Sequence, residues 1–90
     1  MRDLEGRVAF ITGGGSGVGL GMAKAFVAAG MRVAIADIRA DHLEAATAEL
    51  DGPVLPVQLD VTDRDAFARA ADVVERELGG PGTALEHVHT

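Results

Sequence analysis

The feature that most constrains this chain is a glycine-rich run placed between an apolar segment and a helix-like stretch. The run reads Thr12-Gly-Gly-Gly-Ser-Gly-Val-Gly19, and the apolar segment covers residues 8–11. Glycine adopts backbone angles closed to other residues and lets a ligand approach the main chain closely. At a helix start, the free amides and the helix dipole favour an anion. The run therefore predicts a strand-to-helix turn that can hold a pyrophosphate.

The spacing of the glycines excludes two common nucleotide-binding loops. A Walker loop needs Gly-Lys followed by Ser or Thr, whereas Gly19 is followed by Leu20 and Gly21. The strict G-x-G-x-x-G fingerprint is absent in every register. The remaining pattern is Thr-Gly-x-x-x-Gly-x-Gly, on the residues Thr12, Gly13, Gly17 and Gly19.

Apolar runs alternate with helical periodicities along the rest of the chain. We expect strands over residues 7–12, 32–36 and 54–59. We expect helices over residues 17 to about 29, from Asp41 to near Gly52, and from Thr62 to Gly79. The order β-α-β-α-β-α predicts an α/β fold, a partial Rossmann-type parallel sheet with strands in the order third, second, first. The segment 88–90 is interpreted as the start of a fourth strand beside the first.

Caps and apolar spacing predict where the helices begin and which faces they bury. Asp41 with Glu44, and Thr62 with Asp65, have the spacing of capping boxes. Pro56 cannot donate to a sheet ladder, which places the third strand at an edge. The predicted buried faces are Val18, Met22, Phe26 and Ala29 in the first helix, Leu43, Ala46 and Leu50 in the second, and Phe67, Ala71, Val74 and Leu78 in the third.

The Thr-Gly-x-x-x-Gly-x-Gly pattern resembles the cofactor loop of the short-chain dehydrogenase/reductase family. The resemblance extends to Asp37, at the end of the second apolar run, and to residues 59–62, at the end of the third. The family contacts the adenosine half of its cofactor at both places. The resemblance covers residues 4 to about 78 and implies hydride transfer between a nicotinamide cofactor and an alcohol or carbonyl.

The glycine loop would hold the pyrophosphate of that cofactor. Gly13 would make the tight turn, Gly17 would allow close approach of the pyrophosphate, and Gly19 would let helix and strand pack closely. Ser16 and Val18 would contribute backbone amides to the phosphates, and Ser16 a hydroxyl as well.

The acidic residues at the strand ends predict NAD as the cofactor. Asp37 can accept hydrogen bonds from both hydroxyls of the adenine ribose, and its charge would repel a 2'-phosphate. NADP users of the family commonly place a basic residue where this chain has Ser16. Arg39 argues the other way, because a guanidinium can pair with a 2'-phosphate. By resemblance, Asp60 would accept from the adenine amino group and the backbone of Val61 would lie beside the ring.

The groups that carry the family's chemistry are missing from these ninety residues. The family uses a Tyr-x-x-x-Lys pair, a serine and an Asn-Asn-Ala-Gly segment, and this chain contains neither tyrosine nor asparagine. We therefore expect residues 1–90 to form one dinucleotide-binding domain that ends before the catalytic part and is inactive alone. A small-molecule alcohol or carbonyl substrate, and the homo-oligomer usual in the family, would depend on later residues.

Composition and charge exclude several other functions. The net charge is -6 and the eight Lys and Arg are scattered, which argues against nucleic acid. Neither a secretory signal nor a membrane-spanning apolar stretch is present, so we expect a cytoplasmic location and no membrane partner. His87 and His89 have strand spacing, but a metal site needs three or four ligands, so no metal is expected.

Two alternatives remain open at this stage. The chain could be a binding module that pairs the open edge of its first strand with a partner. It could also be a methyltransferase-type fold for S-adenosylmethionine, because Gly15, Gly17 and Gly19 satisfy a G-x-G-x-G loop. Such methyltransferases place an acidic residue just before the glycines, where this chain has Thr12 and Gly13.

Overall fold

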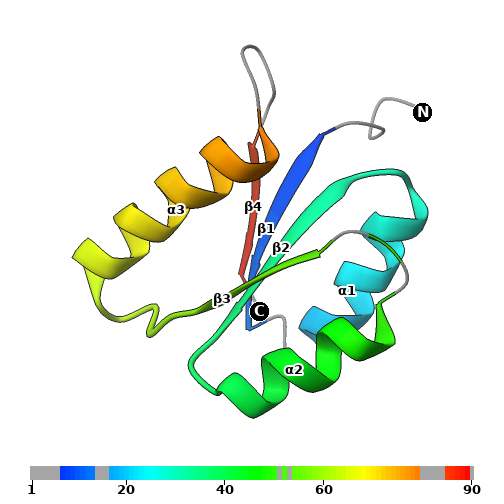
Figure 1. Ribbon diagram of the computed structural model, residues 1–90, viewed down its shortest axis with the longest axis horizontal. Helices are drawn as coiled ribbons and strands as arrows, with labels where there is room; N and C mark the ends of the chain where they lie inside the picture. The colour runs from blue at the N-terminus through cyan, green and yellow to red at the C-terminus, as the bar shows by residue number, and fades with distance from the viewer. Residues whose placement is uncertain (1–6, 14–16, 51, 53, 80–84, 90) are drawn as a thin grey trace.

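The computed structural model describes residues 7–13, 17–50, 52, 54–79 and 85–89. Strands and helices alternate through these residues, as the sequence predicts, and Figure 1 shows their arrangement. The elements are β1 (Val8–Thr12), α1 (Gly17–Ala28), β2 (Arg32–Asp37), α2 (Ala40–Glu49), β3 (Val54–Gln58), α3 (Arg64–Leu78) and β4 (Leu85–His89).

The strands form one parallel sheet in the order β3-β2-β1-β4. The predicted order of the first three strands is confirmed, and Pro56 lies on the edge strand β3, as its missing N–H requires. The fourth strand begins at Leu85 rather than at Val88, because it pairs with the full length of β1, from Val8 opposite Leu85 to Thr12 opposite His89. The predicted fourth strand beside the first is thus confirmed, and the open edge that the binding-module alternative needs is covered by β4.

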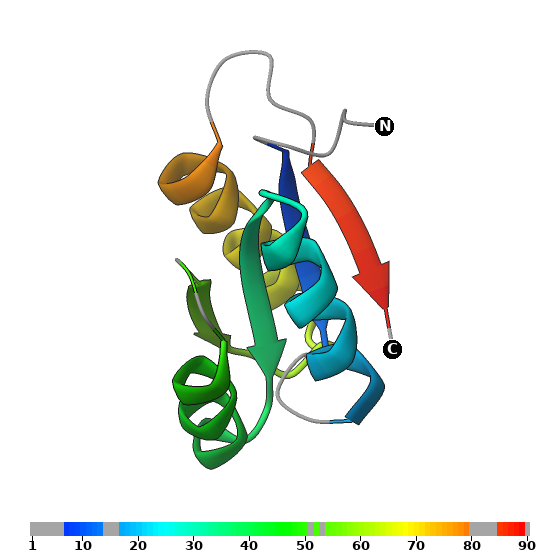
Figure 2. The same cartoon turned by 90° about the vertical axis from the view of Figure 1, so that its right-hand side faces the viewer.

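Helices cover both faces of the sheet, with α1 and α2 on one side and α3 on the other (Figure 2). All five residues of β1 are buried, as expected for a parallel strand packed on both faces. Alternate residues of β1 belong to separate core clusters: Ala9 and Ile11 pack with α1 and α2, whereas Val8 and Phe10 pack with α3. The Phe10 and Phe67 rings lie 5.7 Å apart, which joins β1 to the start of α3.

Two helix starts differ from the predicted capping boxes. The N-cap of α2 is Arg39, so Asp41 lies inside the first turn, where its charge still favours the helix dipole. The N-cap of α3 is Asp63, whose carboxylate accepts a hydrogen bond of 3.0 Å from the amide of Ala66. Thr62 does not cap α3, because its hydroxyl donates to the carboxylate of Asp60 instead.

The helix faces follow the predicted spacing in α2 and α3 and depart from it in α1. Val18 and Ala29 are exposed, whereas Gly19 and Ala23 are buried against the sheet. The small residues decide the orientation of α1, because they let its backbone approach β1 and β2 closely. The helix ends at Ala28, close to the predicted residue 29, and Gly30 follows with a φ of 88°.

Candidate functional site

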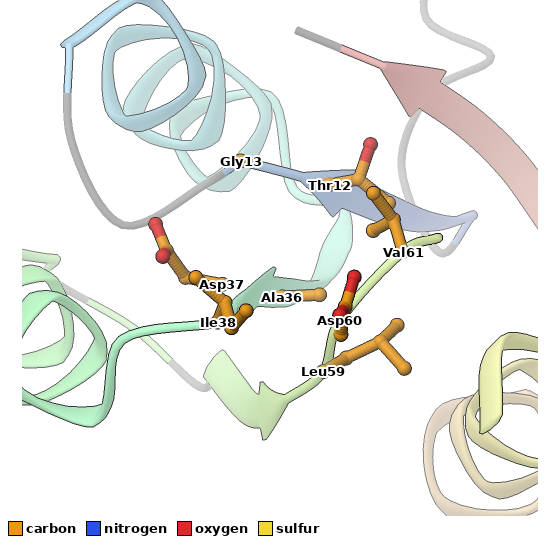
Figure 3. Close-up of a pocket in the computed structure, with 8 residues that line it drawn as sticks. All are labelled: Thr12, Gly13, Ala36, Asp37, Ile38, Leu59, Asp60 and Val61. Carbon is orange, nitrogen blue, oxygen red and sulfur yellow. The ribbon is translucent and has the colours of Figure 1, made fainter. Parts of the chain in front are cut away.

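A pocket of about 270 Å³ opens where β1, β2 and β3 end (Figure 3). In an open parallel sheet, ligands bind at the carboxyl ends of the strands. Four of the residues predicted for the site, Gly13, Asp37, Asp60 and Val61, line this one pocket. The other lining residues are Thr12, Ala36, Ile38 and Leu59.

The glycine positions combine a tight turn with open space. Gly13 has a φ of 72°, and its amide donates to the carbonyl of Ala36 at 2.8 Å, which ties the end of β1 to β2. Gly17, the first residue of α1, has a φ of 61°, and a Cβ added there would meet no atom within 4 Å. Gly19 is buried and Val18 is 74% exposed. Ser16 lies outside the described residues.

The start of α1 is suited to an anion by its partial positive charge as well as by the open space around Gly17. The first turn of the helix contains no acidic residue. The partial positive charge of the helix start is therefore not opposed by a nearby carboxylate of the same turn. The predicted approach of a phosphate past Gly17 to the amide of Val18 remains a prediction, and the open space at Gly17 is compatible with it.

Asp37 is held in place by groups from both sides of the β2 end. Its Oδ1 accepts a hydrogen bond of 3.0 Å from the amide of Arg39, and its Oδ2 lies 3.6 Å from Nδ1 of His42. The carbonyl of Asp37 accepts from the amide of Leu59 at 3.0 Å, which ties β2 to the segment after β3. The side chain is only 12% exposed, so its carboxylate is a fixed acceptor at the pocket wall.

The guanidinium of Arg39 is already engaged by a neighbouring acid. Its Nε donates to Asp41 Oδ1 at 3.1 Å and its Nη2 donates to Asp41 Oδ2 at 2.8 Å. This hydrogen-bonded pair raises the pKa of Arg39 and lowers the pKa of Asp41. Arg39 would have to leave Asp41 in order to bind a phosphate with both of these nitrogens.

Asp60 presents an anionic acceptor at the opposite side of the pocket. Its Oδ1 accepts hydrogen bonds from the hydroxyl of Thr62 at 2.6 Å and from the amide of Thr62 at 2.9 Å. These two bonds lower the pKa of Asp60, the hydroxyl having the larger effect. In Figure 3 the carboxylates of Asp37 and Asp60 project from neighbouring strand ends on the side where Gly13 lies.

Two exposed apolar side chains, Ile38 and Val61, also line the pocket. Ile38 is 59% exposed and Val61 is 46% exposed. Sequence reasoning missed Ile38. The available signal was an apolar residue placed directly after the strand and before Arg39, where nothing in the chain needs it for the core.

The described residues show neither a metal-binding group nor a helix able to cross a membrane. Within the part of the chain that the structure describes, no three His, Asp or Glu side chains are grouped so that they could hold a metal ion. No helix among the described residues is long and apolar enough to span a bilayer.

Comparison with known proteins gives the family. The family model of the short chain dehydrogenases matches residues 7–82, which include every strand-end residue of the pocket. The chain belongs to the short-chain dehydrogenase family. This confirms the resemblance predicted from Thr12, Gly13, Gly17 and Gly19, and it favours neither the strand-pairing nor the methyltransferase-type alternative.

Relatives and solved structures of the family match this chain over part of their length. The C alpha-dehydrogenase of Sphingobium sp. is 48% identical over an alignment of 90 positions, and the match covers 97% of this chain and 30% of that protein. A putative short-chain dehydrogenase from Novosphingobium aromaticivorans is 45% identical with a TM-score of 0.83, over 88% of this chain and 30% of its own. A 3-ketoacyl-(acyl-carrier-protein) reductase from Brucella melitensis, solved with NADH, is 36% identical with a TM-score of 0.77, over 84% of this chain and 31% of its own. The chain thus spans about 30% of the length of these relatives.

Proposed function

We propose that residues 1–90 form the NAD(H)-binding part of a short-chain dehydrogenase that transfers hydride between NAD and an alcohol or carbonyl substrate. The observation that carries the proposal is the carboxylate of Asp37, held at the end of β2 in the pocket that also contains Gly13 and Asp60. A fixed carboxylate at this position of a dinucleotide fold is suited to bind the ribose hydroxyls.

The described residues could contact the pyrophosphate, the adenine ribose and the adenine of the cofactor. The pyrophosphate would lie over the start of α1, where the space around Gly17 is open and Val18 is exposed. The ribose would bind Asp37, and the adenine would lie against Ile38 and Val61 with its amino group donating to Asp60. Ser16 remains a predicted contact to the phosphates.

The preference for NAD over NADP follows from the charges around the ribose position. The 2'-phosphate of NADP would meet the carboxylate of Asp37, and the nearby cation of Arg39 is paired with Asp41. Like charges at close range disfavour binding, and the paired guanidinium offers little compensation.

The nicotinamide, when bound, supplies the carbon that gives or accepts the hydride. The role of these ninety residues would be to bind and orient the cofactor. They contain no tyrosine that could perform the acid–base step of the family. The residues that act on the substrate and those that build an oligomer would belong to the remaining two thirds of a protein like the relatives.

Titration of the chain with NADH and NADPH tests the proposal, with binding followed by cofactor fluorescence. The chain has no tryptophan, so the cofactor signal is free of energy transfer from the protein. We expect tighter binding of NADH, and Asp37→Ala should weaken it about tenfold, the usual effect of losing hydrogen bonds to a charged group. The same substitution should reduce the discrimination against NADPH.

Asp72→Ala is the matched control, because Asp72 is an exposed acid on α3, on the other face of the sheet. It removes the same charge and should leave both affinities unchanged. A wild-type chain that binds neither cofactor would contradict the proposal, and an Asp37→Ala variant with an unaltered NAD preference would remove Asp37 as the discriminating residue.

A further inference from the structure

An ionisable side chain lies beside the proposed ribose carboxylate and has no part in the function proposed above. His42 is the third residue of α2, and its Nδ1 is 3.6 Å from Asp37 Oδ2. The imidazole is 38% exposed, whereas the carboxylate is 12% exposed. A proton can therefore reach His42 from solvent at a point adjacent to a largely covered anion.

The distance between the two groups makes their interaction depend on the charge of the imidazole. At 3.6 Å the nitrogen and oxygen are too far apart for a good hydrogen bond. They are close enough for strong attraction once the ring is positive, because charge interaction falls only slowly with distance. Oδ1 already accepts from the amide of Arg39, so His42 faces the oxygen of Asp37 that is freer to bind a ribose hydroxyl.

We propose that His42 determines cofactor specificity at the ribose position, and that its protonation weakens the preference for NAD over NADP. The inference rests on the proposed NAD(H) site. An imidazolium would compete with the ribose hydroxyls for Asp37 and would cancel much of the negative charge that repels a 2'-phosphate. Histidine is the residue type whose charge most readily changes near neutral pH, so the test varies the pH.

The other charged groups near His42 leave Asp37 as the partner that matters. Arg39 and Asp41, its neighbours in sequence, are joined to each other by two hydrogen bonds and carry no net charge together. The strand β3, which packs against α2, has no ionisable side chain. The remaining ionisable groups on α2, β2 and the adjoining part of α1 are Glu44, Glu49 with its partner Lys24, and Arg32 at the opposite end of β2.

The test compares the pH dependence of cofactor preference in the wild type and in His42→Gln. The ratio of the Kd for NADPH to the Kd for NADH is measured from about pH 8.5 down to about pH 5.5, which spans the range where histidine charges. We expect the wild-type ratio to fall about three- to tenfold more than the His42→Gln ratio, a size typical of a partly solvated charge pair. The 2'-phosphate also titrates in this range, but it does so in both proteins and cancels from the comparison.

His42→Lys is the second variant, because it places a permanent cation at the same position. It should show a weakened NAD preference at every pH, including the highest. Circular dichroism spectra of both variants check that α2 is intact. Parallel pH profiles in the wild type and His42→Gln, or an unchanged preference in His42→Lys, would overturn the inference.

The outcomes separate this inference from the proposed function. If the wild-type chain prefers NADH and loses that preference in Asp37→Ala, the proposed site stands whatever His42 does. If the pH profiles then coincide, the role of His42 alone is refuted. If the wild type binds neither NADH nor NADPH, the site and the role of His42 both fall.

Discussion

Replacing Gly17 by alanine separates two reasons for having glycine at the start of α1. Gly17 has a φ of 61°, an angle that costs an L-residue about 1–2 kcal/mol relative to glycine. A Cβ at this position would meet no atom within 4 Å, so steric crowding adds nothing in the unliganded chain. We therefore expect Gly17→Ala to destabilise the fold by about 1 kcal/mol, the conformational term alone.

Gly21 provides a matched control within the same helix. It too has open space where a Cβ would be placed, but its φ lies outside the left-handed region. Alanine in a helix interior is favoured over glycine by about 1 kcal/mol, so Gly21→Ala should stabilise the chain by a similar amount. Both variants add one methyl group. Their free energies of unfolding should lie on opposite sides of the wild-type value and differ from each other by about 2 kcal/mol.

Thermal unfolding followed by far-ultraviolet circular dichroism measures the stability of both variants, since the chain lacks tryptophan and tyrosine for fluorescence. A difference of about 2 kcal/mol corresponds to roughly 8–16 °C in Tm for a domain of this size. The methyl group of Gly17→Ala would also occupy the space proposed for the pyrophosphate, so NADH binding should be lost beyond what the stability change explains. A Gly17→Ala chain as stable as Gly21→Ala would refute the backbone argument. Unchanged NADH affinity in Gly17→Ala would refute the placement of the pyrophosphate.

Two further predictions concern the acids between β3 and α3. Asp63→Ala should lower the free energy of unfolding by about 1 kcal/mol in urea denaturation, because it removes the N-cap bond to the amide of Ala66, while Asp63→Asn should retain most of it. Thr62→Val should raise the pKa of Asp60 toward its ordinary value, because the hydroxyl bond from Thr62 is the larger cause of the lowered pKa. NMR titration measures this pKa. The control Thr47→Val removes a hydroxyl that is bonded within α2 and should leave the pKa of Asp60 unchanged. The pKa of Asp60 is lower in the folded than in the unfolded state, so Asp60 stabilises the fold above about pH 4 and this contribution is lost as the pH falls through the folded pKa. An acid titration of stability that is identical in wild type and Thr62→Val would contradict this assignment.

The sequence was sufficient for those parts of the fold that depend on short-range pattern. Three short-range features each allow one local structure. The continuous apolar run of β1 suits a buried parallel strand, Gly30 suits the end of α1, and Pro56 suits an edge strand. The limits of β4 could not be predicted in the same way. The fourth strand contains Glu86, His87 and His89, and its length is set by pairing with β1 across a long separation in sequence.

The errors at the helix starts and in α1 come from competition between neighbouring residues. Thr62 and Asp63 can each cap α3, and spacing alone does not show that Asp60 takes the hydroxyl of Thr62. In α1, the apolar periodicity predicted that Val18 would be buried, but close packing through Gly19 and Ala23 turned Val18 outward. Both cases depend on which of two acceptable local choices the surrounding structure stabilises.

The candidate site could be predicted more fully than the helix limits because it is a consequence of the sheet itself. The bond from the amide of Gly13 to the carbonyl of Ala36 and that from the amide of Leu59 to the carbonyl of Asp37 continue the pairing of β1 with β2 and of β2 with β3 past the strand ends. Once the strand order is known, these bonds bring the residues that follow each strand to one edge, whatever the exact residue at which each helix begins. The proposed specificity of the site has a different origin, because the arrangement of Asp37, Arg39 and His42 depends on the first turn of α2, whose N-cap differs from the predicted one. The proposed binding of a dinucleotide would therefore depend on the sheet, whereas the proposed choice between dinucleotides would depend on one helical turn.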